Sequence, residues 1–119
     1  MEFKPIGNLM SEVYYFDTLL AEGANAAYSN FKKSYCISYV KNITKKCDCE
    51  DNPGDIIAQN IGILLSSDIV SIGHAAHKLI IENSGEDVFL KYNKKTGLKQ
   101  VEEAEKLGMD STDYKIIEE

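Results

Sequence analysis

A short apolar run that passes directly into a helix-start signal constrains the fold more than any other feature of this sequence. Ile61-Gly62-Ile63-Leu64-Leu65 has the length of a strand, and its continuous apolar character is typical of a strand buried on both faces of a parallel sheet. Ser66-Ser67-Asp68 then supplies side-chain oxygens for the first N–H groups of a helix. Apolar residues at helical spacing follow, and they predict a helix from about Asp68 to Asn83.

The rest of the chain contains further segments with the periodicity of helices or strands. Apolar residues at spacings of three and four predict an amphipathic helix over Asn8 to Asn30, either continuous with a weak point near Gly23 or divided there into two shorter helices. The other expected elements are a strand over Ser34–Val40, a loop over 41–58, a helix over Leu98–Leu107 and a final strand over Tyr114–Ile117. Glu86–Tyr92 is compatible with a helix or a strand, and Val88, Phe89 and Tyr92 suit a short helix. Because strands separated by helices require crossover connections, we expect a single α/β domain over residues 1–119, with a small, partly parallel, three-stranded sheet flanked by helices.

The composition argues against several classes of function. The net charge is −6, and all 13 basic residues are lysines. Arginine is the side chain that makes bidentate contacts to phosphate and guanine, so an acidic chain without arginine is not expected to bind nucleic acid. Apolar runs are far shorter than the roughly 20 residues of a membrane span, and Met1 to Pro5 does not begin a secretory signal. We therefore expect a cytoplasmic protein with no membrane segment and with reduced cysteines.

Two cysteines and two histidines form a candidate metal site. Cys47 and Cys49 lie in the predicted loop, and His74 and His77 are three residues apart on the predicted helix. Two thiolates and two imidazoles are a ligand set suited to Zn²⁺, although the single residue between the cysteines is shorter than the usual zinc-site spacing. The site requires the cysteine loop to lie near the start of the helix.

Two other interpretations of these residues stay open. In the first, His74 and His77 are ordinary helix residues, one at the surface and one packed against the sheet, and the thiols hold no metal. In the second, the thiols hold an iron–sulfur cluster, for which three cysteines are one fewer than the usual four ligands. No phosphate-binding glycine motif follows a predicted strand, and acidic neighbours disfavour a nucleophilic thiolate, so we expect no enzymatic activity.

From about Ala21 onward, the order of motifs matches a known protein family. The matching features are Ala21-Glu22-Gly23-Ala24, the strand Tyr35–Val40, Asn42-Ile43-Thr44 before Cys47-Asp48-Cys49, Ile61-Gly62-Ile63-Leu64, Ser66-Ser67-Asp68-Ile69-Val70, Gly97-Leu98-Lys99-Gln100 and the closing Tyr114. In these features the chain resembles the C-terminal part of the domain-of-unknown-function 362 family, whose members are described as iron–sulfur centre proteins. The resemblance implies an α/β fold and an accessory role.

The chain departs from the family pattern at positions that are usually acidic. The resemblance places aspartates where this chain has Asn60, Gly73 and Lys78, and a proline where it has Ile69. A metal-binding or catalytic role of those acids in the family would be lost or altered here. Fuller members also carry an upstream α/β half and an insert with closely spaced cysteines, and neither is present in this sequence.

These features predict that the chain works together with another polypeptide. A three-stranded sheet has two open edges. The aromatic triplet Tyr14-Tyr15-Phe16 cannot face one side of a helix, so at least one ring must point towards solvent or a partner. We expect a homo-oligomer, or a protein partner that supplies the missing upstream half. The leading interpretation is an accessory domain associated with a metal through Cys47 and Cys49. The alternatives are an iron–sulfur redox component and a cofactor-free interaction module.

Overall fold

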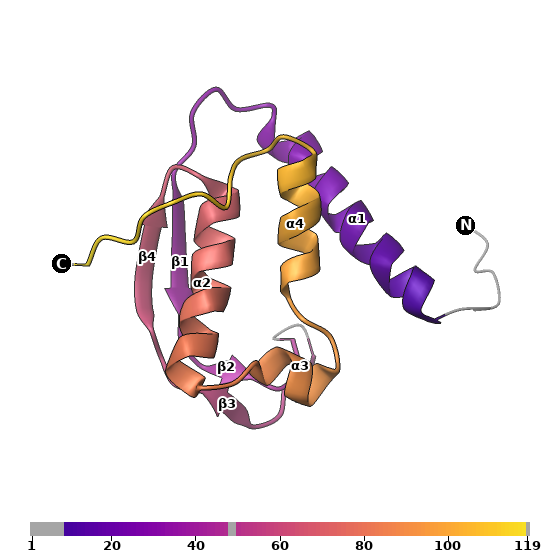
Figure 1. The fold of residues 1–119 in the computed structure, drawn as a ribbon, viewed down its shortest axis with the longest axis vertical. Coiled ribbons are helices and arrows are strands. Elements are labelled where there is room, and N and C mark those ends of the chain that lie inside the picture. The colour runs from indigo at the N-terminus through magenta and orange to yellow at the C-terminus, as the bar shows by residue number, and fades with distance from the viewer. Residues whose placement is uncertain (1–8, 48–49, 119) are drawn as a thin grey trace.

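The protein folds into a two-stranded ribbon with helices packed along one side (Figure 1). The computed structural model describes the backbone of residues 9–47 and 50–118 and the side chains of residues 16–47 and 50–118. In chain order the elements are α1 (Leu9–Tyr28), β1 (Cys36–Val40), β2 (Ile43–Thr44), β3 (Ile56–Ala58), β4 (Gly62–Ser66), α2 (Ile69–Ser84), α3 (Val88–Asn93) and α4 (Leu98–Lys106).

The strands pair differently from the sequence-based expectation. β1 and β4 form an antiparallel ribbon in which Ser38 faces Leu64, and β2 pairs antiparallel with β3 in a separate small sheet. The expected partly parallel, three-stranded sheet is therefore wrong, since the described residues contain no parallel pair. The chain travels from β1 to β4 through the β2–β3 hairpin, without a crossover helix, so β4 returns in the opposite direction.

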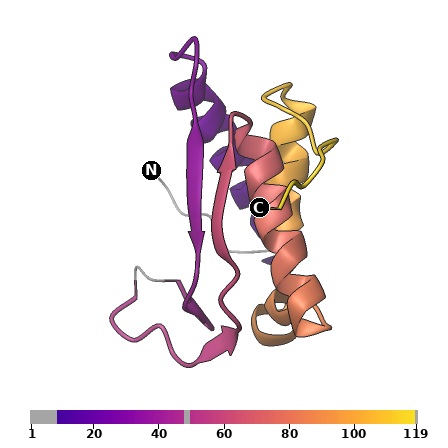
Figure 2. The same cartoon turned by 90° about the vertical axis from the view of Figure 1, so that its left-hand side faces the viewer.

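The segment expected to be a loop over 41–58 contains the β2–β3 hairpin, which Figure 2 shows at the end of the ribbon. Ile43 of β2 and Ile57 of β3 pack against the cluster that contains Val40 and Ile80. Ile80 belongs to the C-terminal half of α2, so the hairpin lies beside the end of that helix. The metal-site interpretation required this segment to lie near the helix start.

The passage from β4 into α2 follows the sequence prediction. β4 ends just before Asp68, which is the N-cap of α2. One carboxylate oxygen of Asp68 accepts a hydrogen bond from the Ser71 N–H at 2.7 Å, and the other accepts one from the Ser111 N–H at 3.2 Å. At the far end, Gly85 adopts a left-handed conformation with φ 74°, and its N–H closes the last turn. The predicted strand, cap and helix are therefore confirmed.

The helices occur where the sequence predicts them. α1 continues through Gly23 without a break, although a glycine inside a helix lowers its intrinsic stability. α3 and α4 fall within a few residues of the ranges expected over 86–92 and 98–107. None of the described helices is long and apolar enough to cross a membrane.

α2 is the central element of the fold, and Figure 1 shows it between the ribbon and α4. Near its N-terminal end, Val70 packs with Ala21 of α1 and Ala104 of α4. Nearer its C-terminal end, Ile80 packs with Val40 of β1. The two clusters share no residue, so α2 is the element that joins the ribbon to the other helices.

The segment after α4 packs along α2. The expected strand over Tyr114–Ile117 is wrong, because the described residues that follow α4 include no strand. Instead, the Ser71 hydroxyl donates to the Ser111 carbonyl at 2.6 Å, and His74 Nδ1 lies 2.7 Å from the Tyr114 hydroxyl. Side chains of one helix therefore hold this segment in place.

Replacing the cap of α2 should destabilise the protein. Asp68→Ala removes both hydrogen bonds that its carboxylate accepts, so the free energy of unfolding should fall by about 1–2 kcal/mol. Glu102→Ala, at an exposed position of α4, should leave it unchanged within experimental error. Urea unfolding followed by circular dichroism measures both variants. Equal effects of the two substitutions would show that the cap does not stabilise the fold.

Candidate docking surface

The face of the β1–β4 ribbon that points away from α2 is apolar and exposed. Five side chains form this surface, which we call the outer face: Tyr35, Ile37, Tyr39, Ile63 and Leu65. Their exposed fractions range from 54% to 82%. Ile37 faces Leu65 directly across the ribbon, and Tyr39 faces Ile63, so the side chains form one continuous patch.

The alternation along β1 is the reverse of the usual arrangement. The smaller Cys36, Ser38 and Val40 occupy the face towards α2, where Val40 is buried, and the large residues of the outer face point away from it. Large apolar side chains that alternate with small or polar ones normally mark the buried face of a strand. The expectation that β4 is buried on both faces is also wrong, because Ile63 and Leu65 are exposed. The outer face therefore has the composition of a surface that another element covers.

The size and charge of the outer face also favour docking. Two tyrosines and three aliphatic side chains of this exposure present on the order of 700 Å² of surface, more than the largest apolar patch of a typical monomer. β1 and β4 contain no charged residue. Lys41 lies at the margin, with its Nζ 5.4 Å from the centre of the Tyr39 ring. A complementary surface therefore has to be apolar and free of charge at its centre.

The two histidines are held by contacts within the helical part of the molecule. The buried His77 ring stacks on Phe89 of α3 with ring centres 5.1 Å apart, and its Nε2 has no hydrogen-bond partner. Gly97 approaches this ring so closely that a Cβ there would lie 3.0 Å from His77 Cδ2. Burial lowers the pKa of His77, which the Asp87 carboxylate opposes and His74 reinforces. His77 is thus a buried residue whose ring stacks on α3.

The structure does not test the four-residue metal site. Cys49 lies outside the described residues, and Cys47 is exposed in the β2–β3 loop. The side chains that contact His74 and His77 come from the C-terminal segment and α3, and the backbone of Gly97 before α4 also approaches His77. Among the residues that the structure describes, no three His, Cys, Asp or Glu side chains are placed to hold a metal ion. The zinc and iron–sulfur assignments stay predictions, and we derive no chemistry from them.

Within the aromatic triplet of α1, the structure describes the side chain of Phe16. This ring is exposed, as the sequence predicts for at least one of the three, and Lys95 Nζ lies 5.6 Å from its centre. The same ammonium group lies 2.8 Å from the carboxylate of the buried Asp17. The side chains of Tyr14 and Tyr15 lie outside the described set.

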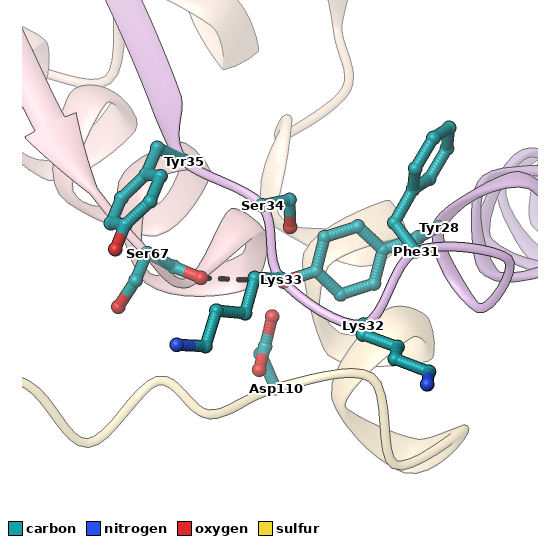
Figure 3. Close-up of a pocket in the computed structure, with 8 residues that line it drawn as sticks. All are labelled: Tyr28, Phe31, Lys32, Lys33, Ser34, Tyr35, Ser67 and Asp110. Carbon is teal, nitrogen blue, oxygen red and sulfur yellow. Dashed lines mark hydrogen bonds between the residues drawn. The ribbon is translucent and has the colours of Figure 1, made fainter.

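A half-open pocket of about 430 Å³ lies where the α1–β1 connection meets the start of α2. Figure 3 shows Tyr28 at its centre, with its hydroxyl donating to the Ser67 carbonyl at 3.3 Å, and the Asp110 carboxylate beside it. Lys32 and Lys33 extend to opposite sides in this view. The polar groups do not converge on one point, so the pocket is a weaker candidate for a binding site than the outer face.

The positions that depart from the family pattern have ordinary contacts in this structure. Asn60 Oδ1 accepts a hydrogen bond from the Asn42 N–H at 2.8 Å, Gly73 is exposed on α2, and Lys78 pairs with Glu82 at 3.8 Å. No protein-family model matches this chain, and no curated protein or solved structure is significantly similar to it. The resemblance to the domain-of-unknown-function 362 family therefore stays a prediction that rests on the quoted motifs.

The burial of His77 should make the stability of the protein depend on pH. Burial lowers the folded-state pKa of His77 below its unfolded value, which is about 6.5. Its contribution to stability is therefore complete above that value and is lost progressively as the pH falls below it. The free energy of unfolding should be lower at about pH 5.5 than at about pH 7.5 in the wild type, with a smaller difference in His77→Phe. Equal differences would assign the effect to groups other than His77.

Metal analysis tests the cysteine and histidine site. Any metal bound to the wild-type protein should be absent from a Cys47→Ser, Cys49→Ser double variant and retained by Cys36→Ser, because Cys36 lies on β1 away from the loop. Anaerobic purification, an absorption spectrum and elemental analysis distinguish the cases. Stoichiometric zinc favours the four-residue site, and iron with sulfide favours a cluster. Metal content that is unchanged in the double variant would remove both thiols from the site.

Proposed function

We propose that this chain is a cytoplasmic, non-enzymatic assembly module that pairs with a second copy of itself through the outer face of the β1–β4 ribbon. The observation that carries the proposal is the reversed alternation of β1, which leaves the large residues of the outer face exposed. Packing two such faces against each other forms a small sandwich, in which sheets lie about 10 Å apart.

The area of the outer face suits a stable pair. A standard protein–protein interface buries about 800 Å² on each partner, and the outer face supplies most of that area from five side chains. Two of these are tyrosines, which are enriched among the residues that dominate binding energy. Their hydroxyl groups can stay at the rim while the rings are buried.

The ribbon also has a symmetry that is compatible with self-pairing. An antiparallel ribbon has a local two-fold axis, here close to the Ser38–Leu64 pair. This axis relates Ile37 to Ile63 and Tyr39 to Leu65. Each of these apolar side chains of β1 therefore has an apolar counterpart on β4. A symmetric pair brings the same patch of both copies together, and the uncharged strands β1 and β4 place no like charges against each other there.

The described chemistry supports a role without catalysis. Burial, together with the Asp110 and Asp68 carboxylates, raises the pKa of the Cys36 thiol, which disfavours the reactive thiolate. His77 is packed in the core with its Nε2 buried. The resemblance to the domain-of-unknown-function 362 family, whose fuller members carry an upstream α/β half, also favours an accessory role.

A positive charge introduced into the outer face should make the two copies of the protein dissociate. Ile37→Lys and Leu65→Lys each place a cation in the centre of the contact while leaving the monomer fold intact, because both positions are exposed. Each should raise the dissociation constant by about thirtyfold or more, the effect of a central interface residue. Leu90→Lys, at an exposed apolar position of α3, is the matched control and should not change it.

Sedimentation velocity over a series of protein concentrations measures the association, and far-ultraviolet circular dichroism checks the fold of each variant. A wild-type protein that stays monomeric at high concentration would overturn the proposal. So would an equal loss of association in Leu90→Lys.

A further inference from the structure

α1, which lies on the side of the molecule opposite the ribbon in Figure 1, carries a second apolar surface. Phe16, Leu20, Gly23 and Ala27 lie within about 60° of one another around the helix axis, and all four are exposed. Leu19 and Ala24 flank them and are also exposed. We call these six residues the α1 stripe. None of them carries a charge.

The α1 stripe is separate from the side of α1 that packs on the protein. Ala21 and Tyr28 face the cluster formed with Val70 and Ala104, and Asp17 is buried against Lys95. These residues lie roughly 110° around the helix from the centre of the stripe. Another helix can therefore pack on the stripe without displacing α4.

The order of side-chain sizes along the stripe identifies its occupant. Large side chains occupy the N-terminal half of the stripe, and glycine or alanine occupies the C-terminal half. We infer that α1 packs antiparallel against α1 of a second copy. In one register Phe16 lies opposite Ala27, Leu19 opposite Ala24, and Leu20 opposite Gly23, and symmetry repeats each of these pairs. Every large side chain then meets a small one, which lets the two helix backbones approach closely.

Charge complementarity favours the same arrangement. The last turn of α1 contains no basic residue to balance the negative end of the helix dipole, although its last carbonyl groups accept hydrogen bonds from the residues that follow. Lys95 Nζ lies 5.6 Å from the Phe16 ring, and Phe16 lies opposite Ala27 in the last turn of the second helix. The pairing therefore places an ammonium group near the negative end of the partner helix. Glu22 lies on another side of α1 and stays outside the contact.

The contact through the α1 stripe is smaller than the contact through the outer face. Three half-exposed large side chains and three small ones present on the order of 300–400 Å² on each copy, below the area of a standard interface. On its own this contact forms a weak dimer. Because α1 and the ribbon lie on opposite sides of α2 and α4 in Figure 1, the α1 contact can join ribbon-paired dimers into larger assemblies as the protein concentration rises.

Gly23 provides the test. A Cβ at this position meets no atom within 4 Å in the monomer, and leucine favours a helix more than glycine does. Gly23→Leu should therefore leave the fold intact but fill the space that Leu20 of the second copy occupies. In the Ile37→Lys background, where only the α1 contact operates, it should raise the dimer dissociation constant by about tenfold or more.

Exchanging the two side chains should restore pairing. In Leu20→Gly, Gly23→Leu, each leucine again faces a glycine of the second copy, so the dissociation constant should return to within about threefold of the unsubstituted helix. Glu22→Leu introduces the same side chain one position away, on another side of the helix, and should have no effect.

Sedimentation velocity over a concentration series distinguishes this proposal from the ribbon pair. If only the ribbon proposal fails, Ile37→Lys leaves wild-type association unchanged, and Gly23→Leu still weakens it. The α1 contact is overturned if the Ile37→Lys protein is monomeric at every concentration, if Gly23→Leu has no effect, or if the exchanged variant does not recover.

Discussion

The position of α2 between the ribbon and the other helices is the constraint on which the rest of the structure depends. One helix covers only one face of a ribbon, so the β1–β4 pair has one buried face and one exposed face. In the same way, α4 and α2 cover only part of α1. The described part of the chain has no large side chain that is fully buried. Stability therefore comes from two small clusters joined through α2.

Two carboxylates organise the start of α2 and, with it, the path of the C-terminal segment. Asp68 accepts from the N–H groups of Ser71 and Ser111, and Asp110 Oδ2 accepts from the Ile69 N–H at 3.2 Å. The first N–H groups of a helix lack partners within the helix, and carboxylates satisfy both their hydrogen bonds and the positive end of the helix dipole. The same bonds attach the segment after α4 to α2.

The two outward surfaces differ in ways that suit different contacts. The outer face is a pleated patch of aromatic and aliphatic side chains, which fits another sheet. The α1 stripe is a narrow ridge in which large and small residues occupy opposite halves, which fits another helix. In the proposed assembly each surface pairs with its own kind, so the two contacts do not compete for one partner.

The two histidines illustrate how spacing along a chain differs from proximity in a fold. The sequence suggests that Cys47 lies near the histidine pair only because it predicts a loop close to the start of the helix that carries the histidines. In the structure the β2–β3 hairpin packs beside Ile80, in the C-terminal half of α2. Tyr114 and Phe89, which are distant in sequence, contact His74 and His77. These contacts arise from elements that follow α2, and the sequence spacing contained no signal for them.

The helices, the α2 cap and the positions of β1 and β4 can be obtained from the amino-acid sequence, because periodicity, Asp68 and Gly85 act over a few neighbouring residues. In the sequence, the outer face is visible only as the alternation of large apolar residues with small or polar ones around Ile37. This alternation predicts that one side of the strand is covered, but it does not identify what covers it. Folding sets the antiparallel pairing of β1 with β4, the side on which α2 packs and the exposure of the outer face. Those features depend on contacts between residues far apart in the chain, such as Ser38 with Leu64, and local patterns do not specify which distant strand will pair or in which direction.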